Sequence, residues 1–218
     1  MANGSLAQEH SSHLQHHFVD SDQQFDTSKM GMWVFLVTEI LFFGGLFAAY
    51  IIYRAWYPDL FIQASDHLNT LWGGINTVVL IGSSLTVAMA IRSAQLNQKK
   101  GLMINLGITI ALAFVFMLIK YFEYTHKFHL GIFPGEYYTY EGIEHAKANI
   151  FFSIYYMMTG LHGIHVIIGI GLMVWLLIKA NKNTYSSEYY TPVEIVGLYW
   201  HLVDIIWIFL FPLLYLID

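Results

Sequence analysis

The chain has 218 residues, of which 56% are hydrophobic and 17% aromatic, whereas only 11% are charged. A soluble domain carries about 25% charged residues, so this composition favours a membrane protein. Cysteine is absent, which excludes disulfides, thiolate zinc sites and iron–sulfur clusters. The net charge of −5 gives no indication of nucleic-acid binding, and we expect no nucleic acid among the partners.

The first 28 residues are polar and contain no apolar run of the kind found in a secretory signal peptide. We predict that residues 1–28 form a solvated N-terminal tail and that residues 29–218 form one membrane domain. The alternative is that the tail binds a metal ion through its histidines, which are His10, His13, His16 and His17.

Five apolar runs are long enough to cross a bilayer as helices, since a span needs about 20 residues. They cover residues 33–53, 71–91, 102–122, 149–178 and 192–217. The sequence therefore predicts an all-α fold, a polytopic transmembrane bundle of five helices. Residues 191–194 fit a capping box with proline at the first helical position, and so predict the start of the last helix. The longest connection, residues 123–148, is expected to cap one face of the membrane.

The distribution of lysine and arginine predicts how the chain crosses the membrane, because cytoplasmic loops carry an excess of both. Of the 10 such residues, the N-terminal side receives Lys29, Arg92, Lys99, Lys100, Lys179 and Lys182. The opposite side receives Arg54, Lys120, Lys127 and Lys147. This excess predicts a cytoplasmic N-terminus and a C-terminus on the outer side of the membrane.

Six polar residues lie in or next to the predicted spans, although a charged residue at mid-membrane costs roughly 2.5 to 3.5 kcal/mol on insertion scales. They are Glu39, Glu123, His162, His165, His201 and Asp204. Glu123 and the nearby Lys120 lie at the end of a span, where the cost is lower. We expect the Lys120 side chain to extend to the membrane interface.

These polar residues allow more than one interpretation. In a structural role they bond across helices, with His165 as a candidate partner of Glu39. Asp204 lies on the same helix face as His201 and is expected to orient it. A copper, iron or haem site drawing on His162, His165 and His201 is an alternative, although no motif requires it. A proton path is another, and it needs a continuous chain of polar groups between the two faces.

Three stretches carry signatures that are specific in combination. Residues 31–50 hold Glu39 within an apolar helix. Residues 151–169 hold Thr159, Gly160, His162, Gly163, His165 and Val166. Residues 199–215 hold Tyr199, Trp200, His201, Val203 and Asp204. Together they resemble subunit III of the haem-copper respiratory oxidases, the cytochrome c oxidase type. The resemblance extends from about Lys29 to the C-terminus, with Glu123 at the family's end-of-helix glutamate. Five spans are similar to the short bacterial form, which lacks the first two helices of longer members.

The resemblance implies a role in aerobic respiratory electron transport. A subunit III holds no haem, copper or catalytic centre of its own. It packs beside the catalytic subunit I, in a complex with subunit II, other oxidase subunits or a larger respiratory supercomplex. It binds structural phospholipids, stabilises the catalytic subunit and supports proton uptake, as a multi-pass protein of the bacterial inner membrane. Quinol oxidases have a closely similar subunit, so the electron donor stays open, as do an autonomous metal or haem membrane protein and a proton transporter.

Overall fold

The computed structural model describes residues 15–143 and 147–217, and over these ranges the chain is helical. The elements in chain order are α1 (Ser21–Trp56), α2 (Pro58–Ser65), α3 (Thr70–Gln95), α4 (Lys99–His129), the 3-10 turn η1 (Gly135–Tyr137), α5 (Ala148–Asn181) and α6 (Thr191–Tyr215). Among the described residues, α1, α3, α4, α5 and α6 are long and apolar enough to cross a membrane. The predicted all-α bundle of five spanning helices is therefore confirmed.

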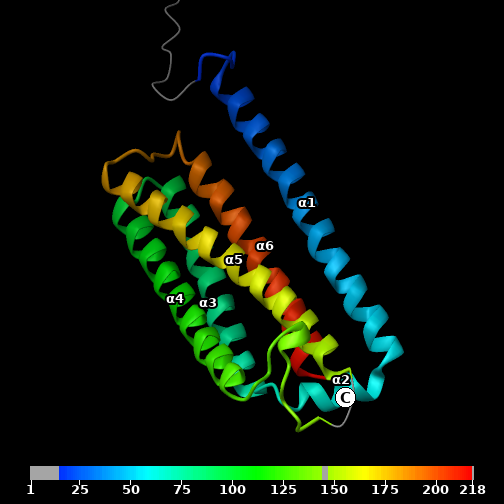
Figure 1. Cartoon of the computed structure of the whole chain (residues 1–218). Helices are drawn as coiled ribbons and strands as arrows, with labels where there is room; N and C mark the ends of the chain where they lie inside the picture. The colour runs from blue at the N-terminus through cyan, green and yellow to red at the C-terminus, as the bar shows by residue number, and fades with distance from the viewer. Residues whose placement is uncertain (1–14, 144–146, 218) are drawn as a thin grey trace, which may run out of the picture.

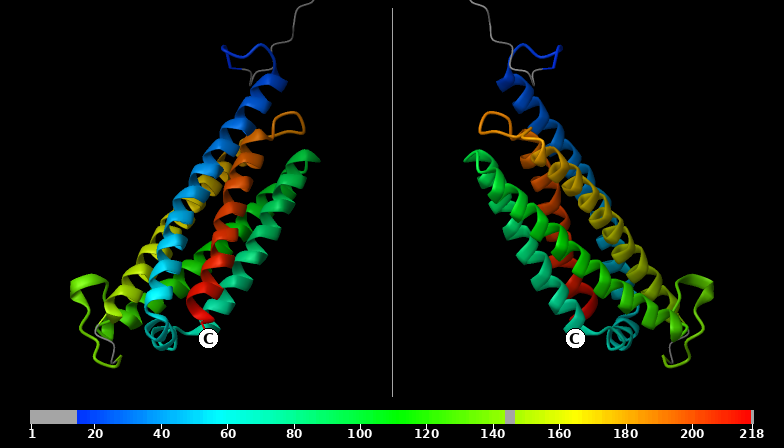
Figure 2. Two further views of the ribbon diagram at one scale, coloured as in Figure 1. Left: turned by 90° about the vertical axis from the view of Figure 1, so that its right-hand side faces the viewer. Right: turned by 90° about the vertical axis from the view of Figure 1, so that its left-hand side faces the viewer.

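The long helices lie side by side, and consecutive spans run in opposite directions (Figures 1 and 2). The helix α3 packs against α4 and α6, while α5 packs against α4 and α6. The first helix, α1, lies at the edge of the bundle, where it contacts α6, α5 and α2. The short helix α2, the segment 130–143 and the C-terminus gather at one end, which we call the α2 end of the bundle.

Polar side chains define several helix starts. Asp20 caps α1 by accepting a hydrogen bond from the backbone N–H of Gln23 at 2.7 Å. Asn69 caps α3 by accepting one from the N–H of Trp72 at 3.2 Å. Short polar residues are favoured at these positions because they satisfy backbone donors that the first turn leaves free. The helix α2, which begins at Pro58, was not predicted, since eight residues are too few to give a span signal.

Two local predictions are wrong. The segment at residues 191–194 does start α6, but no side chain caps that helix. The Glu194 carboxylate instead forms an ion pair with Lys29 of α1 at 2.9 Å, so it joins two helices rather than closing a capping box. The predicted connection 123–148 is also shorter, because α4 continues to His129. Its added turns keep Glu123 within reach of Lys127, one helical turn further on.

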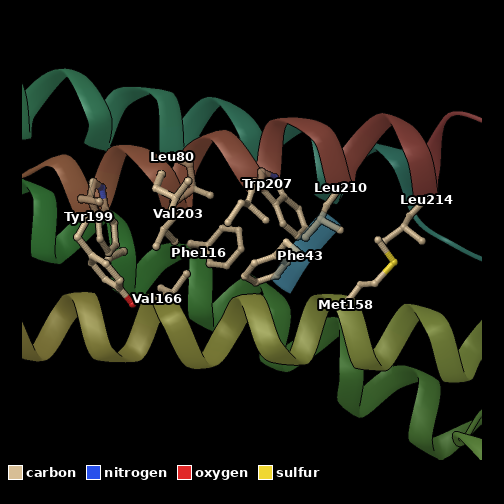
Figure 3. Packing of buried hydrophobic residues seen from close by; sticks show 14 of the residues in the cluster. Phe43, Leu80, Phe116, Met158, Val166, Tyr199, Val203, Trp207, Leu210 and Leu214 are labelled. Atoms are coloured by element: carbon tan, nitrogen blue, oxygen red, sulfur yellow. The ribbon is translucent and has the colours of Figure 1, made fainter. Parts of the chain in front are cut away.

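The core is built on one face of α6. Tyr199, Val203, Trp207, Leu210 and Leu214 recur at the spacing of that face and are buried (Figure 3). They meet Val166 and Met158 of α5, Phe116 of α4, Leu80 of α3 and Phe43 of α1. The helices approach closely where α5 offers glycine, since a Cβ at Gly169 would lie 2.6 Å from the Trp200 ring. The helix α6 thus packs against α1, α3 and α5 through the apolar core.

Candidate functional site: buried polar groups between the helices

Glu123 is the centre of a buried cluster at the α2 end. Its Oε1 accepts hydrogen bonds from Lys127 Nζ at 2.8 Å, Tyr155 OH at 2.9 Å and Tyr215 OH at 2.6 Å. Its Oε2 accepts one from Lys120 Nζ at 2.8 Å. We call these five residues the Glu123 cluster. They come from α4, α5 and α6, so the cluster ties three helices together by charge-assisted hydrogen bonds.

Lys120 points into the bundle, and the prediction that its side chain extends to the interface is wrong. Its side chain is 9% exposed, and its Nζ donates to Tyr215 OH at 2.6 Å as well as to Glu123. The ammonium also lies 4.5 Å from the centroid of the Trp207 ring. A carboxylate one turn away and aromatic faces replace the water that the interface would have provided. Glu123, expected at a low-cost boundary, is likewise buried.

Glu39 of α1 and His165 of α5 form a second polar contact. Glu39 Oε2 lies 2.9 Å from His165 Nε2, and His165 Nδ1 lies 2.8 Å from the carbonyl oxygen of Leu161. Because a carbonyl only accepts, Nδ1 carries a hydrogen. The contact at Nε2 therefore contains one shared proton, either on a neutral carboxyl that donates or on an imidazolium that donates. The pair is electrically neutral in both arrangements, which suits its position within a span.

His162 lies one turn from His165 but faces other helices. It is 1% exposed and packs against Phe116 and Trp207, with ring centroids 5.6 and 5.3 Å apart. Neither ring nitrogen has a hydrogen-bond partner among the residues that the structure describes. An aromatic environment of this kind excludes water, so His162 is held by packing rather than by a polar contact.

The structure does not bring His201 and Asp204 together. His201 Nδ1 lies 2.7 Å from Ser84 Oγ of α3. Neither carboxylate oxygen of Asp204 has a hydrogen-bond partner among the described residues. The two residues share a helix face, but α3 packs against α6 there, and its Ser84 hydroxyl is the group within hydrogen-bond distance of His201 Nδ1. The expectation that Asp204 orients His201 is therefore wrong.

The polar groups remain in separate places. Glu39 and His165 link α1 to α5, Glu123 lies in its own cluster, and His201 faces α3. Within residues 15–143 and 147–217, no three histidine, aspartate or glutamate side chains are close enough to hold a metal ion. His10 and His13 of the predicted tail lie outside the described residues.

Two tryptophan contacts were missed at the sequence level. Trp200 Nε1 donates to Ser83 Oγ at 3.0 Å, and Trp207 Nε1 donates to Thr77 Oγ1 at 3.1 Å. In addition, the Tyr50 hydroxyl donates to the carbonyl of Leu213 and so fastens α1 to the end of α6. The tryptophans are seven residues apart on α6, and the hydroxyl residues are six residues apart on α3. Matched spacing of this kind is the signal that would have indicated antiparallel pairing.

Comparison of the sequence with known proteins identifies the family of this chain. The sequence profile of the family described as "Cytochrome c oxidase subunit III" matches residues 7–218. A cytochrome c oxidase subunit 3 from Synechocystis sp. is 34% identical over 193 residues, which cover 88% of this chain and 76% of the relative. A heme-copper oxidase subunit I+III from Aeropyrum pernix is 30% identical, over 88% of this chain and 23% of the relative. A probable quinol oxidase subunit 3 from Staphylococcus saprophyticus is 29% identical, over 87% and 89%. The chain therefore belongs to the cytochrome c oxidase subunit III family.

Proposed function

We propose that this subunit of a haem-copper oxidase has no catalytic centre of its own and acts by stabilising the catalytic subunit and supporting its proton uptake. The observation that carries the proposal is the family match over residues 7–218. The polar residues of the spans support it, since Glu39, Glu123 and His201 contact polar side chains of neighbouring helices. Residues used in this way hold a bundle together rather than bind a substrate.

The nearest partner is subunit I. In the relative from Aeropyrum pernix, subunits I and III form one polypeptide, which requires the two parts to lie in one complex. We infer that this chain packs beside a separate subunit I, with subunit II in the same complex. The residues Glu39, Glu123, His162, His165, His201 and Asp204 maintain the shape that subunit I contacts, and structural phospholipids fill the remaining contacts. Haem and copper belong to the partner subunits.

A donor of the cytochrome c type is our first proposal, because the Synechocystis relative carries that name. The quinol alternative rests on the relative from Staphylococcus saprophyticus, which has a similar identity and coverage. The two are separated by isolating the complex in mild detergent and identifying its other subunits. A copper-bearing subunit II with cytochrome c oxidation supports the first proposal, whereas oxidation of quinol alone supports the second.

The accessory role is tested by comparing the oxidase with and without this subunit. We expect a normal initial rate of oxygen reduction in both forms, followed by faster loss of activity during turnover in the form that lacks it. We also expect no haem absorption and no stoichiometric metal in the isolated chain. A zero initial rate without the subunit, or one metal ion per chain that is lost on changing His162, contradicts the proposal. Flux of protons through liposomes that hold the chain alone indicates a transporter.

We further propose that the N-terminus lies in the cytoplasm and the α2 end on the outer side of the bacterial inner membrane. The lysine and arginine excess at the N-terminal side supports this orientation. Five spans require the two termini to lie on opposite sides. Reporter fusions at residues 1 and 218 test the proposal, and the same compartment for both fusions contradicts it.

A further inference from the structure

A cavity of about 470 Å³ opens at the α2 end, beside the Glu123 cluster. The start of α3, the last turns of α4 and the residues after α2 enclose it. Both Glu123 and Lys127 are among its lining residues, so the cavity reaches the cluster directly. None of the contacts described above explains why a space of this size lies beside buried charges.

The Glu123 cluster contains two ammonium groups and one carboxylate. The side chains of Lys120, Glu123 and Lys127 are 9%, 5% and 4% exposed, so water screens these charges poorly. The tyrosine hydroxyls add hydrogen bonds but no opposite charge. An uncompensated positive charge in such a place is destabilising unless an anion or water reaches it. The charge balance of the cluster therefore favours a negatively charged group in the cavity.

Lys127 is the ammonium best placed to meet that group. It has three N–H donors, and among the described residues one hydrogen bond is formed, to Glu123 Oε1 at 2.8 Å. The centroid of the Tyr155 ring lies 5.1 Å from Lys127 Nζ. Lys120, in contrast, already donates to both Glu123 and Tyr215. The donors of Lys127 that remain are the ones that a ligand in the cavity reaches.

The other titratable groups around the cavity are His67, His126 and Asp66. The two histidines add donors and gain positive charge when protonated. His67 Nδ1 lies 3.0 Å from the carbonyl oxygen of Gln63, which leaves Nε2 for another contact. Asp66 repels an anion at the rim, and its exposure to solvent reduces this repulsion without removing it. The cavity is thus positive at its buried wall and mixed at its rim.

The cavity also has an apolar side. Ile119, Phe122 and Trp72 line it, and the side chains of Phe122 and Trp72 are largely exposed. Tryptophan at the end of a span is typical of the headgroup level of a bilayer. A ligand in this place has an anionic group next to Lys127 and an apolar part along α4.

We propose that this cavity binds a phosphate-bearing anion, with its phosphate oxygens accepting hydrogen bonds from Lys127. A phosphodiester carries the required charge and several acceptor oxygens, and basic pockets between spans bind such headgroups. The source is an anionic phospholipid of the adjacent leaflet or free inorganic phosphate, and the apolar wall favours the lipid. The proposal deepens the lipid part of the proposed function, but its test measures binding and does not depend on oxidase activity.

The test uses the purified oxidase complex, washed in detergent and then incubated with phosphatidylglycerol or with inorganic phosphate. Bound phospholipid is counted by mass spectrometry, and protection by phosphate is followed as a shift in the melting temperature of this subunit. The variants are Lys127→Gln and Asp66→Asn. The matched control is Lys29→Gln, because Lys29 also pairs with a glutamate but lies at the opposite end of the bundle.

We expect Lys127→Gln to weaken phosphatidylglycerol retention about tenfold, since it removes a hydrogen bond to a charged group. Asp66→Asn is expected to increase retention, and Lys29→Gln to leave it unchanged. Asp66→Asn also decides the matter if Lys127→Gln fails to assemble, because Asp66 is exposed. Protection by inorganic phosphate that Lys127→Gln abolishes, without lipid retention, supports the site with free phosphate as its source. Retention and protection that are the same in the wild type and both variants overturn the proposal.

Discussion

Two buried carboxylates in this bundle have opposite surroundings. Glu123 of α4 accepts four hydrogen bonds, two of them from ammonium groups. Asp204 of α6 is also buried, yet its oxygens have no hydrogen-bond partner among the described residues. Glu39 lies between these extremes, with one hydrogen-bond contact among the described residues, to His165. The number of donors around each acid therefore follows from which helices meet there, and not from the residue type.

The difference has an energetic consequence. A buried charge that is well paired contributes little net stability, but removal of its partner leaves an uncompensated charge, which costs far more. Glu123 has such partners, whereas Asp204 has none among the residues that the structure describes. Four substitutions test this contrast, and they are described in order of decreasing expected effect.

Glu123→Gln has the largest expected effect. It leaves Lys120 and Lys127 buried without a counter-ion, which is expected to lower the free energy of unfolding by about 3 to 5 kcal/mol. The purified oxidase is titrated with a denaturing detergent, and the fraction of complexes that have lost this subunit is measured at each concentration. Glu136→Gln is the control, because Glu136 is exposed in the segment after α4. Equal stability of the two variants would show that Glu123 is not the centre of the cluster.

His165→Leu is expected to come next. Glu39 then loses the one hydrogen-bond partner that it has among the described residues, although its side chain keeps 18% exposure. We expect a loss of about 1 to 3 kcal/mol, measured by the same titration. His129→Leu, at the exposed end of α4, is the control. If Glu39→Gln combined with His165→Leu is as costly as the two single losses added together, the residues are not coupled.

Lys120→Met is expected to cost about 1 kcal/mol, clearly less than Glu123→Gln, although both break the same ion pair. The reason is charge balance, because the remaining Glu123 and Lys127 are neutral as a pair. Methionine also keeps apolar contact with the Trp207 ring. Lys100→Met, at the exposed start of α4, is the control. A loss as large as that of Glu123→Gln would mean that the cluster carries no excess positive charge.

Asp204→Asn is expected to change the free energy of unfolding by less than about 0.5 kcal/mol or to raise it. The amide has nearly the same volume, brings no charge into the bundle, and deprives no described residue of a hydrogen bond. Asp26→Asn, on the exposed start of α1, provides the comparison. A loss of several kcal/mol would reveal a partner for Asp204, such as an internal water molecule, and would remove the contrast with Glu123.

Several features of this protein follow from the sequence alone. The five spans and the all-helical fold were predictable because a bilayer requires long apolar runs, which the hydropathy of the sequence reveals. The family was recognisable from short signatures around Glu39, His162 and His201. These properties are local, since each depends on residues that are neighbours in the chain. The contact between Glu39 and His165 was also foreseen, because an isolated acid in a span needs a partner and few polar residues were available.

Tertiary structure alone decided which polar groups meet. His162 and His165 are three positions apart, but one faces Trp207 and the other Glu39, since each side of α5 contacts a different helix. His201 pairs with Ser84 rather than Asp204, because α3 packs against the same face of α6. The Lys120 side chain points into the bundle because it donates a hydrogen bond to Glu123 there and its ammonium group lies against the Trp207 ring of α6. Hydrogen bonds and ion pairs act over a few ångströms, and the distance between helices far apart in the chain is set by packing.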